Sequence, residues 1–254
     1  GYELVENIGN PNYTHCQTYN NAIPFTHTGM SFDVSGFLGG LSDTVGLTLY
    51  AVNGWDTYID NTEGKSFGFY LTYAPNDDFF ISLATIHGPE AWGVQSESDD
   101  VMMYDVVATY SLPQVDKLSL GFNWDHGYAE EQRAGEHGGG AGVNISSDQS
   151  GGTGKSGAHW WAMVYYAMYD FTDNQMGALR YEYFDDQDAA KGYGHSLWTT
   201  TYTHNITVAD NLMIRPEVRY NKYNVPTADE KTGGDKGNTF DDEWIIGIGT
   251  EYIF

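Results

Sequence analysis

The twelve residues that end the chain, Glu243 to Phe254, constrain the fold more than any other stretch. Alternate residues form one apolar face with an aromatic at each extremity, in the order Trp244, Ile246, Ile248, Thr250, Tyr252 and Phe254. The opposite face is small or charged, with Gly247, Gly249 and Glu251. An apolar face bounded by aromatics, and about as tall as the apolar band of a bilayer, is typical of a transmembrane β-strand. The stretch therefore predicts a membrane β-barrel.

The same alternation recurs along the chain and predicts about eleven strands. They are expected at Thr28–Leu38, Val45–Trp55, Ser66–Tyr73, Phe79–His87, Val101–Tyr110, Leu118–Tyr128, Trp160–Phe171, Met176–Phe184, Leu197–Val208, Leu212–Tyr223 and Trp244–Phe254. In the third, Phe67, Phe69 and Leu71 alternate with Gly68 and Tyr70. Such alternation indicates a sheet with an apolar outside and a polar inside.

The connections between these strands alternate between short and long. Gly39–Asp43, Pro75–Asp78, Pro113–Asp116, Thr172–Gln175 and Ala209–Asn211 are short, whereas 56–64, 88–100, 130–158, 185–195 and 224–242 are long. Outer-membrane barrels have tight turns on the periplasmic side and long loops on the outer side. A soluble sandwich has no reason to place every long loop at one end. The pattern therefore favours an antiparallel up-and-down barrel in a bacterial outer membrane.

Composition agrees with this interpretation. No apolar run approaches the roughly 18 residues of a membrane helix, and aromatic residues make up 15% of the chain. The net charge of −24 excludes nucleic acid as a partner, because no basic patch is available to neutralise phosphates. A single cysteine excludes an intrachain disulfide framework.

One domain over residues 1–254 is expected. Residues 28–254 would supply the regular strands, and residues 1–27 the upper end of a strand at Tyr2–Glu6 followed by an extracellular loop. Because an odd number of strands does not close an ordinary bacterial barrel, at least one further strand is expected before Thr28. The chain is thus interpreted as the C-terminal part of a larger barrel.

Four stretches resemble a known family. Asn10-Pro11-Asn12-Tyr13, residues 22–29 (AIPFTHTG), residues 52–56 (VNGWD) and residues 215–220 (RPEVRY) are similar to the OmpL-like β-barrel porins, the group called porin-2. The resemblance extends over most of the chain and is most specific in its first half. It implies a porin in which further strands and a signal peptide precede Gly1-Tyr2-Glu3.

Charged side chains on the inward faces are the candidate pore lining. They are Asp33, Asp105, Asp125, Arg180, Glu182, Arg215, Glu217, Arg219 and Glu251. Opposite charges in such positions can set the field of a water-filled constriction. The alternative is that the arginines and the glutamates Glu182 and Glu217 form a static network of ion pairs that braces or plugs the barrel. Sequence alone leaves both open.

Aromatic residues near strand ends are expected to form girdles at the two membrane interfaces. The candidates are Trp55, Trp92, Trp161, Trp198 and Trp244 on the long-loop side, with Tyr252 and Phe254 at the other end. No Gly-x-Ser-x-Gly motif and no metal-ligand spacing occur, so neither an enzyme nor a cofactor or metal site is predicted.

The sequence thus predicts an outer-membrane porin for passive diffusion of small hydrophilic solutes or ions, with a preference for cations. The expected partners are membrane lipid, lipopolysaccharide and these solutes or cations, and a homo-oligomer is left open. The alternative is a structural or partner-binding barrel without an open pore. A soluble glycan-binding sandwich is a third, minor hypothesis.

Overall fold

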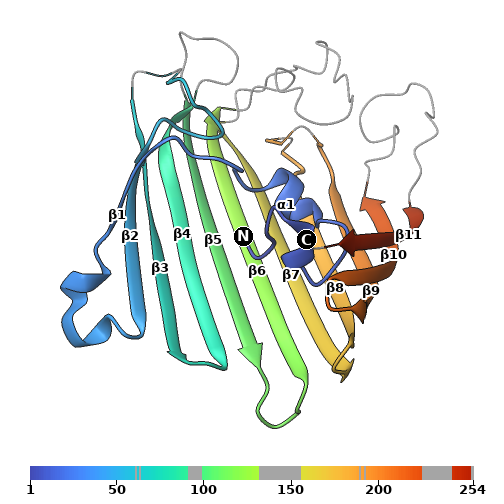
Figure 1. Cartoon of the computed structure of the whole chain (residues 1–254). Helices are drawn as coiled ribbons and strands as arrows, with labels where there is room; N and C mark the ends of the chain where they lie inside the picture. The colour runs from blue at the N-terminus through green and yellow to red at the C-terminus, as the bar shows by residue number, and fades with distance from the viewer. Residues whose placement is uncertain are drawn as a thin grey trace, which may run out of the picture.

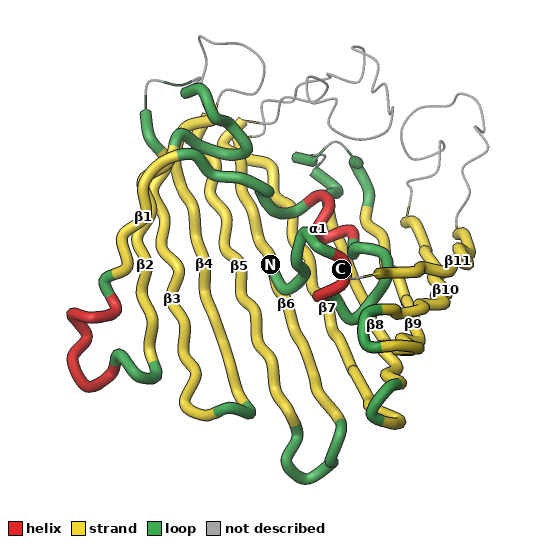
Figure 2. The backbone as a smooth tube through the Cα atoms, viewed as in Figure 1, coloured by secondary structure: helices red, strands yellow, loops and turns green. Residues whose placement is uncertain are grey.

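A computed structural model of the chain describes residues 1–60, 62, 64–90, 99–131, 156–188, 190–191, 193–224 and 242–252. Within them, one antiparallel sheet contains eleven strands in chain order (Figures 1 and 2). They are β1 (Gly29–Asp33), β2 (Val45–Val52), β3 (Ser66–Asn76), β4 (Phe79–Glu90), β5 (Asp99–Ser111), β6 (Leu118–Glu131), β7 (Ser156–Thr172), β8 (Gln175–Asp185), β9 (Ser196–Ala209), β10 (Leu212–Asn224) and β11 (Asp242–Tyr252). The predicted up-and-down antiparallel fold is confirmed.

In the described residues three short helical segments accompany the sheet: η1 (Asn7–Gly9), α1 (Gln17–Asn21) and η2 (Ser35–Leu41). None of the helices in the described ranges is long and apolar enough to cross a membrane. The sheet curves, and residues before β1 run across its concave side (Figure 1). Strands β1 and β11 are the two edges of the sheet.

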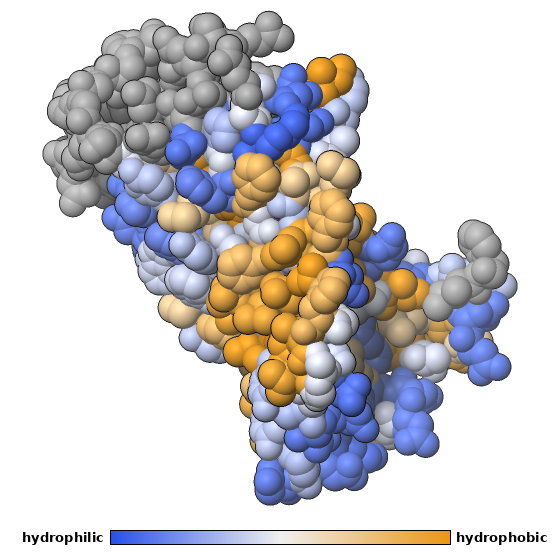
Figure 3. All heavy atoms as spheres, turned by 90° about the vertical axis from the view of Figure 1, so that its left-hand side faces the viewer, coloured by the Kyte–Doolittle hydropathy of each residue, from blue (hydrophilic) through white to orange (hydrophobic). Residues whose placement is uncertain are grey.

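The outer face of the sheet is apolar at mid-height. Met30, Phe32, Leu49 and Phe67 are all exposed on this face, with 43–64% of their surface accessible. Figure 3 shows this band over β1 to β3, with hydrophilic residues above and below it. Exposed apolar side chains gathered in one band between polar rims indicate a surface made for lipid rather than water.

Aromatic rings line the outer face near the long connections. Trp161 packs on Tyr183 at 4.9 Å between ring centroids, and Trp198 packs on Tyr220 at 5.4 Å. Tyr220 in turn lies 4.8 Å from Trp244. These contacts cross from β7 to β11, as an interfacial aromatic girdle would.

The structure differs from the expected strands most clearly before β2, and β2 itself ends at Val52 instead of Trp55. The first strand ends at Asp33 instead of Leu38, because the chain then enters η2, where Gly39 adopts a positive φ of 61°. No strand forms in residues 1–27, so the strand end expected at Tyr2–Glu6 is absent. The reason lies in the contacts of that segment with the concave face.

Candidate functional site

Residues 1–22, here called the inner segment, lie on the concave face of the sheet. Figures 1 and 2 show the segment in front of β5 to β8, with α1 facing β7 and β8. Apart from η1 and α1 it has no regular secondary structure, so most of its main-chain groups need partners elsewhere. Side chains on the concave face of the sheet, here called the wall, supply these partners.

Two wall carboxylates accept the N–H groups of the inner segment. Glu182 on β8 accepts hydrogen bonds from the main-chain nitrogens of Gln17 (3.0 Å) and Thr18 (2.5 Å), at the start of α1. Glu217 on β10 accepts them from Tyr13 (2.8 Å) and Thr14 (3.2 Å). Each carboxylate also receives one threonine hydroxyl from the segment and one from β9. Both glutamates therefore bind the main chain of the inner segment rather than a solute.

Three wall guanidinium groups donate to the carbonyl oxygens of the inner segment. Arg215 donates from Nη1 to the Asn7 oxygen at 2.8 Å and from Nη2 to the Asn10 oxygen at 2.5 Å. Arg180 donates to the Thr14 oxygen at 2.6 Å, and Arg219 to the His15 oxygen at 3.1 Å. Acidic wall residues thus accept from the N–H groups of the inner segment, and basic wall residues donate to its carbonyl oxygens.

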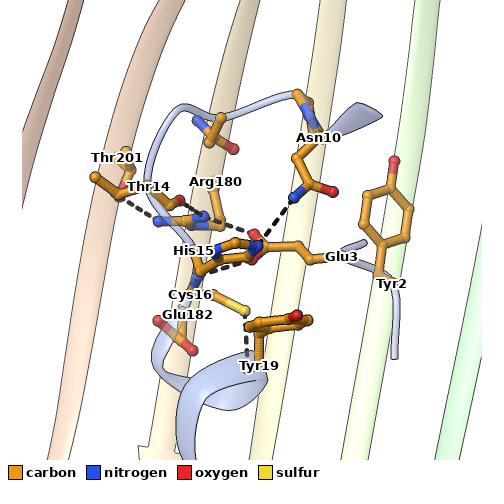
Figure 4. A network of polar contacts seen from close by, with 12 residues as sticks. Tyr2, Glu3, Asn10, Thr14, His15, Cys16, Tyr19, Arg180, Glu182 and Thr201 are labelled. Atoms are coloured by element: carbon orange, nitrogen blue, oxygen red, sulfur yellow. Dashed lines mark hydrogen bonds and ion pairs between the residues drawn. The ribbon is translucent and has the colours of Figure 1, made fainter. Parts of the chain in front are cut away.

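A buried ion pair fixes the start of the inner segment. Arg180 Nη1 lies 2.6 Å from Glu3 Oε1, and the side chains are 0% and 1% exposed. Glu3 also accepts hydrogen bonds from the Tyr166 hydroxyl and from the Cys16 main chain. Figure 4 shows Glu3, Arg180 and Cys16 converging beneath the loop that leads into α1. Burial, followed by the charge of Glu3, raises the pKa of the Cys16 thiol well above its ordinary value.

Two glycines give the inner segment its close approach to the wall. A Cβ on Gly121 of β6 would lie 2.6 Å from the ring of Tyr2, and a Cβ on Gly249 of β11 would lie 2.4 Å from the ring of Tyr13. Tyr2 also stacks on Tyr166 with centroids 4.1 Å apart. Small residues on these inward faces are therefore a packing requirement.

The end of the inner segment is fastened near the long connections. Trp160 of β7 donates from Nε1 to the Ala22 oxygen at 3.0 Å, and the Tyr193 hydroxyl donates to Asn21 Oδ1 at 2.6 Å. Lys191 Nζ lies 4.4 Å from the centroid of the Trp55 ring and 4.8 Å from that of Trp160. Burial lowers the pKa of Lys191 to about 8.

Beside the inner segment the concave face of β2 to β5 is hollowed. Two hollows lie there, of about 230 Å³ and 600 Å³, and share Tyr50, Tyr70, Ala84 and Asp105 among their lining residues. His27 lines the first and Ser82 the second. Neither hollow has a lysine or an arginine in its lining.

The structure places the nine candidate pore residues in three settings. Arg180, Glu182, Arg215, Glu217 and Arg219 are buried at 0–5% exposure and contact the inner segment. Glu251 belongs with them, through a 2.7 Å ion pair with Arg215. Asp105 and Asp125 lie opposite each other on β5 and β6, and Asp33 is exposed on β1.

The candidates for the aromatic girdle also lie on different sides of the sheet. Trp161, Trp198 and Trp244 lie in the outer aromatic band, and Tyr252 is 58% exposed on β11. Trp55 is instead on the inner side, where its ring packs against the buried Trp160 at 5.9 Å and its main chain donates to Glu90. The girdle interpretation of Trp55 is therefore wrong, because the residue lies past the end of β2. Trp92 and Phe254 lie outside the described residues.

Sequence reasoning missed the inner-segment partners of the wall. Glu3, Asn12 and Thr18 are all buried, yet they fall in a stretch without periodicity. Asn12 donates to Thr203 at 2.8 Å. One signal for these partners was available in the sequence. Arg and Glu alternate on the inward faces, and such charges need hydrogen-bond or ion-pair partners elsewhere in the chain.

Together, the sheet, its apolar outer band and the polar interior define a membrane β-barrel protein. The chain belongs to the family described as "Putative beta-barrel porin-2, OmpL-like", which it matches over residues 1–254. The predicted family is thereby confirmed. No curated protein matches the chain significantly.

Two solved structures are similar to the chain. One is an anion-selective porin from Comamonas acidovorans, at 11% identity and a TM-score of 0.49, with 71% of this chain and 46% of that one covered. The other is a Pseudomonas aeruginosa FadL homologue, at 13% identity and a TM-score of 0.44, with 83% and 63% covered. The chain thus spans less than two thirds of either structure.

Proposed function

We propose that the protein is an outer-membrane channel for passive diffusion of small hydrophilic solutes or ions, narrowed by the inner segment. The observation that carries this proposal is the segment itself, which lies inside the curve of the sheet, next to two hollows over the concave face of β2 to β5. A fixed internal segment beside an open wall makes a constriction whose size is set by the fold.

We further propose a preference for cations. The charge of Arg180 is neutralised by Glu3 and that of Arg215 by Glu251, so these two arginines offer little field to a passing anion. Asp105 lines both hollows beside the inner segment, and no lysine or arginine lines either of them. The net charge of −24 would also concentrate cations near the protein.

The alternative is a barrel without an open pore, with the inner segment as its plug. The observation in its favour is the burial of five charged wall residues beneath the segment. In that case the network of Arg180, Glu182, Arg215, Glu217 and Arg219 would brace the interior and no solute would pass.

Single-channel recording of the purified protein in a planar bilayer under a KCl gradient tests these proposals. Ohmic steps with a reversal potential of the sign for K⁺ flow support an open, cation-preferring channel. Steps that reverse with the sign for Cl⁻ keep the channel and remove the cation preference. Inserted protein without steps establishes the plugged barrel.

A further inference from the structure

Two tyrosines of the wall line both hollows beside the inner segment. They are Tyr50 on β2 and Tyr70 on β3, and both are partly exposed. Among the described residues, neither ring packs on another aromatic ring and neither hydroxyl has a hydrogen-bond partner. Tyr2, by comparison, stacks on Tyr166. Two aromatic rings and two hydroxyl groups are therefore available to a solute in the hollows.

Small residues lie beside both tyrosines in the sheet. Tyr50 is opposite Gly68 of β3 and, on its other side, Ser31 of β1. Tyr70 is opposite Ala84 of β4. Directly opposed side chains of an antiparallel pair approach each other most closely. Because these neighbours are a glycine, a serine and an alanine, no large side chain of an opposed residue covers either ring there.

The register also places the two tyrosines close to each other. Tyr70 lies two residues beyond Gly68 on the same strand, so Tyr50 and Tyr70 are diagonal neighbours on one face. Diagonal neighbours in a sheet are about 7–8 Å apart, within reach of aromatic side chains. One solute the size of a single sugar ring can therefore contact both.

The other polar groups of the hollows are mostly hydroxyls. Ser82 and Thr109 line the larger hollow. Asp105 is the one acidic residue among the described residues that line either hollow, and its Oδ2 already accepts from Asn123 Nδ2 at 3.2 Å. An anionic solute finds no lysine or arginine there. Hydroxyl groups both donate and accept, so they suit a solute that itself carries hydroxyls.

We propose that Tyr50 and Tyr70 form a binding site for an uncharged sugar, with the two rings against the C–H face of the sugar. The face of an aromatic ring is negative and attracts the hydrogens of C–H groups, while the sugar hydroxyls bond to the hydroxyls of the wall. This inference rests on the proposed function and names one class of hydrophilic solute for the channel. The cation preference is a separate proposal and concerns ions.

Swelling of vesicles that contain the protein, in glucose and in sorbitol, tests the site. The two solutes are uncharged and similar in size, but only glucose is a closed ring. The wild type should admit glucose faster. Tyr70→Leu should lower the ratio of the two rates about threefold, because contacts with an aromatic ring shift an equilibrium about two- to tenfold. Tyr73→Leu, on the outer face of the same strand, should leave the ratio unchanged. Equal rates in the wild type, or an unaltered ratio in Tyr70→Leu, overturn the site.

Saturation-transfer NMR of the protein in detergent measures binding without transport. Glucose should receive more transfer than sorbitol, and Tyr50→Leu and Tyr70→Leu should each reduce this difference. Tyr70→Phe keeps the ring and should retain most of it. Transfer specific to glucose without vesicle swelling or channel steps would reject the proposed function and keep the site. Equal transfer to the two solutes rejects the site, whether or not bilayer recording shows a channel.

Discussion

The carboxylate of Glu3 joins the inner segment to the wall through Arg180, Tyr166 and the Cys16 main chain. Removal of one partner from a buried ion pair costs about 3–5 kcal/mol, because the other charge stays buried and uncompensated. We therefore expect Glu3→Gln to lower the free energy of unfolding by several kcal/mol, measured by denaturant titration in detergent. Glu6→Gln, at an exposed position of the same segment, should stay within about 0.5 kcal/mol of the wild type. Equal effects of the two substitutions would show that the ion pair contributes nothing.

Asp186, in the connection after β8, gives a prediction about pH. Its carboxylate accepts from the main-chain nitrogens of Lys191 and Tyr193, but burial outweighs these bonds and raises its pKa from 3.8 to about 6. The folded state therefore binds more protons than the unfolded state between these values, and stability falls as pH rises from about 4 to 6. Asp186→Asn should flatten this part of the profile of unfolding temperature against pH. Asp188→Asn, at an exposed site of the same connection, should retain the slope of the wild type.

At the scale of elements, the docking of the inner segment can be followed through Cys16, the one cysteine of the chain. The thiol is 1% exposed and its pKa is raised by burial, so little reactive thiolate is available to a maleimide. We expect labelling of the native protein to be at least roughly tenfold slower than that of the unfolded protein, since each unit of pKa lowers the thiolate fraction tenfold. Glu182→Ala removes the carboxylate that holds the start of α1 and should accelerate labelling, monitored by mass spectrometry. Asp33→Ala, away from the segment, should not, and equal acceleration by both would reject the role of Glu182.

The strands could be predicted from the sequence, whereas the inner segment could not. Strand alternation is local, so β3 to β11 are found within a few residues of the expected positions. The inner segment is held by contacts such as that between Arg215 and the Asn7 oxygen, 208 residues apart in the chain. No periodicity marks such a segment, because its backbone is satisfied by side chains of the wall. Inward charges such as Arg180 and Glu217 could be predicted, but the main-chain groups they bind could not.

At the scale of the whole molecule, the position of the apolar band follows from the strand pattern, whereas the space left inside the curve of the sheet does not. The band depends on which face each side chain occupies, and alternation specifies that. The interior space depends on how far the inner segment extends from the wall, and that follows from contacts such as Tyr2 on Tyr166. The sequence thus predicts the membrane orientation of the wall better than its interior.

The membrane setting of the whole molecule can be tested on the outer face. Leu179 on β8 is 46% exposed and points away from the buried face that holds Arg180. An arginine on the lipid face of a barrel costs about 2–4 kcal/mol near the bilayer midplane and about 0–1 kcal/mol near the interfaces. We therefore expect Leu179→Arg to destabilise folding into lipid vesicles by an amount in the higher range, measured by denaturant titration. Asn211→Arg, in the short turn between β9 and β10, should fall in the lower range. Exposed leucines of a water-soluble sheet tolerate arginine, so a cost below about 0.5 kcal/mol at Leu179 would contradict a lipid-facing band.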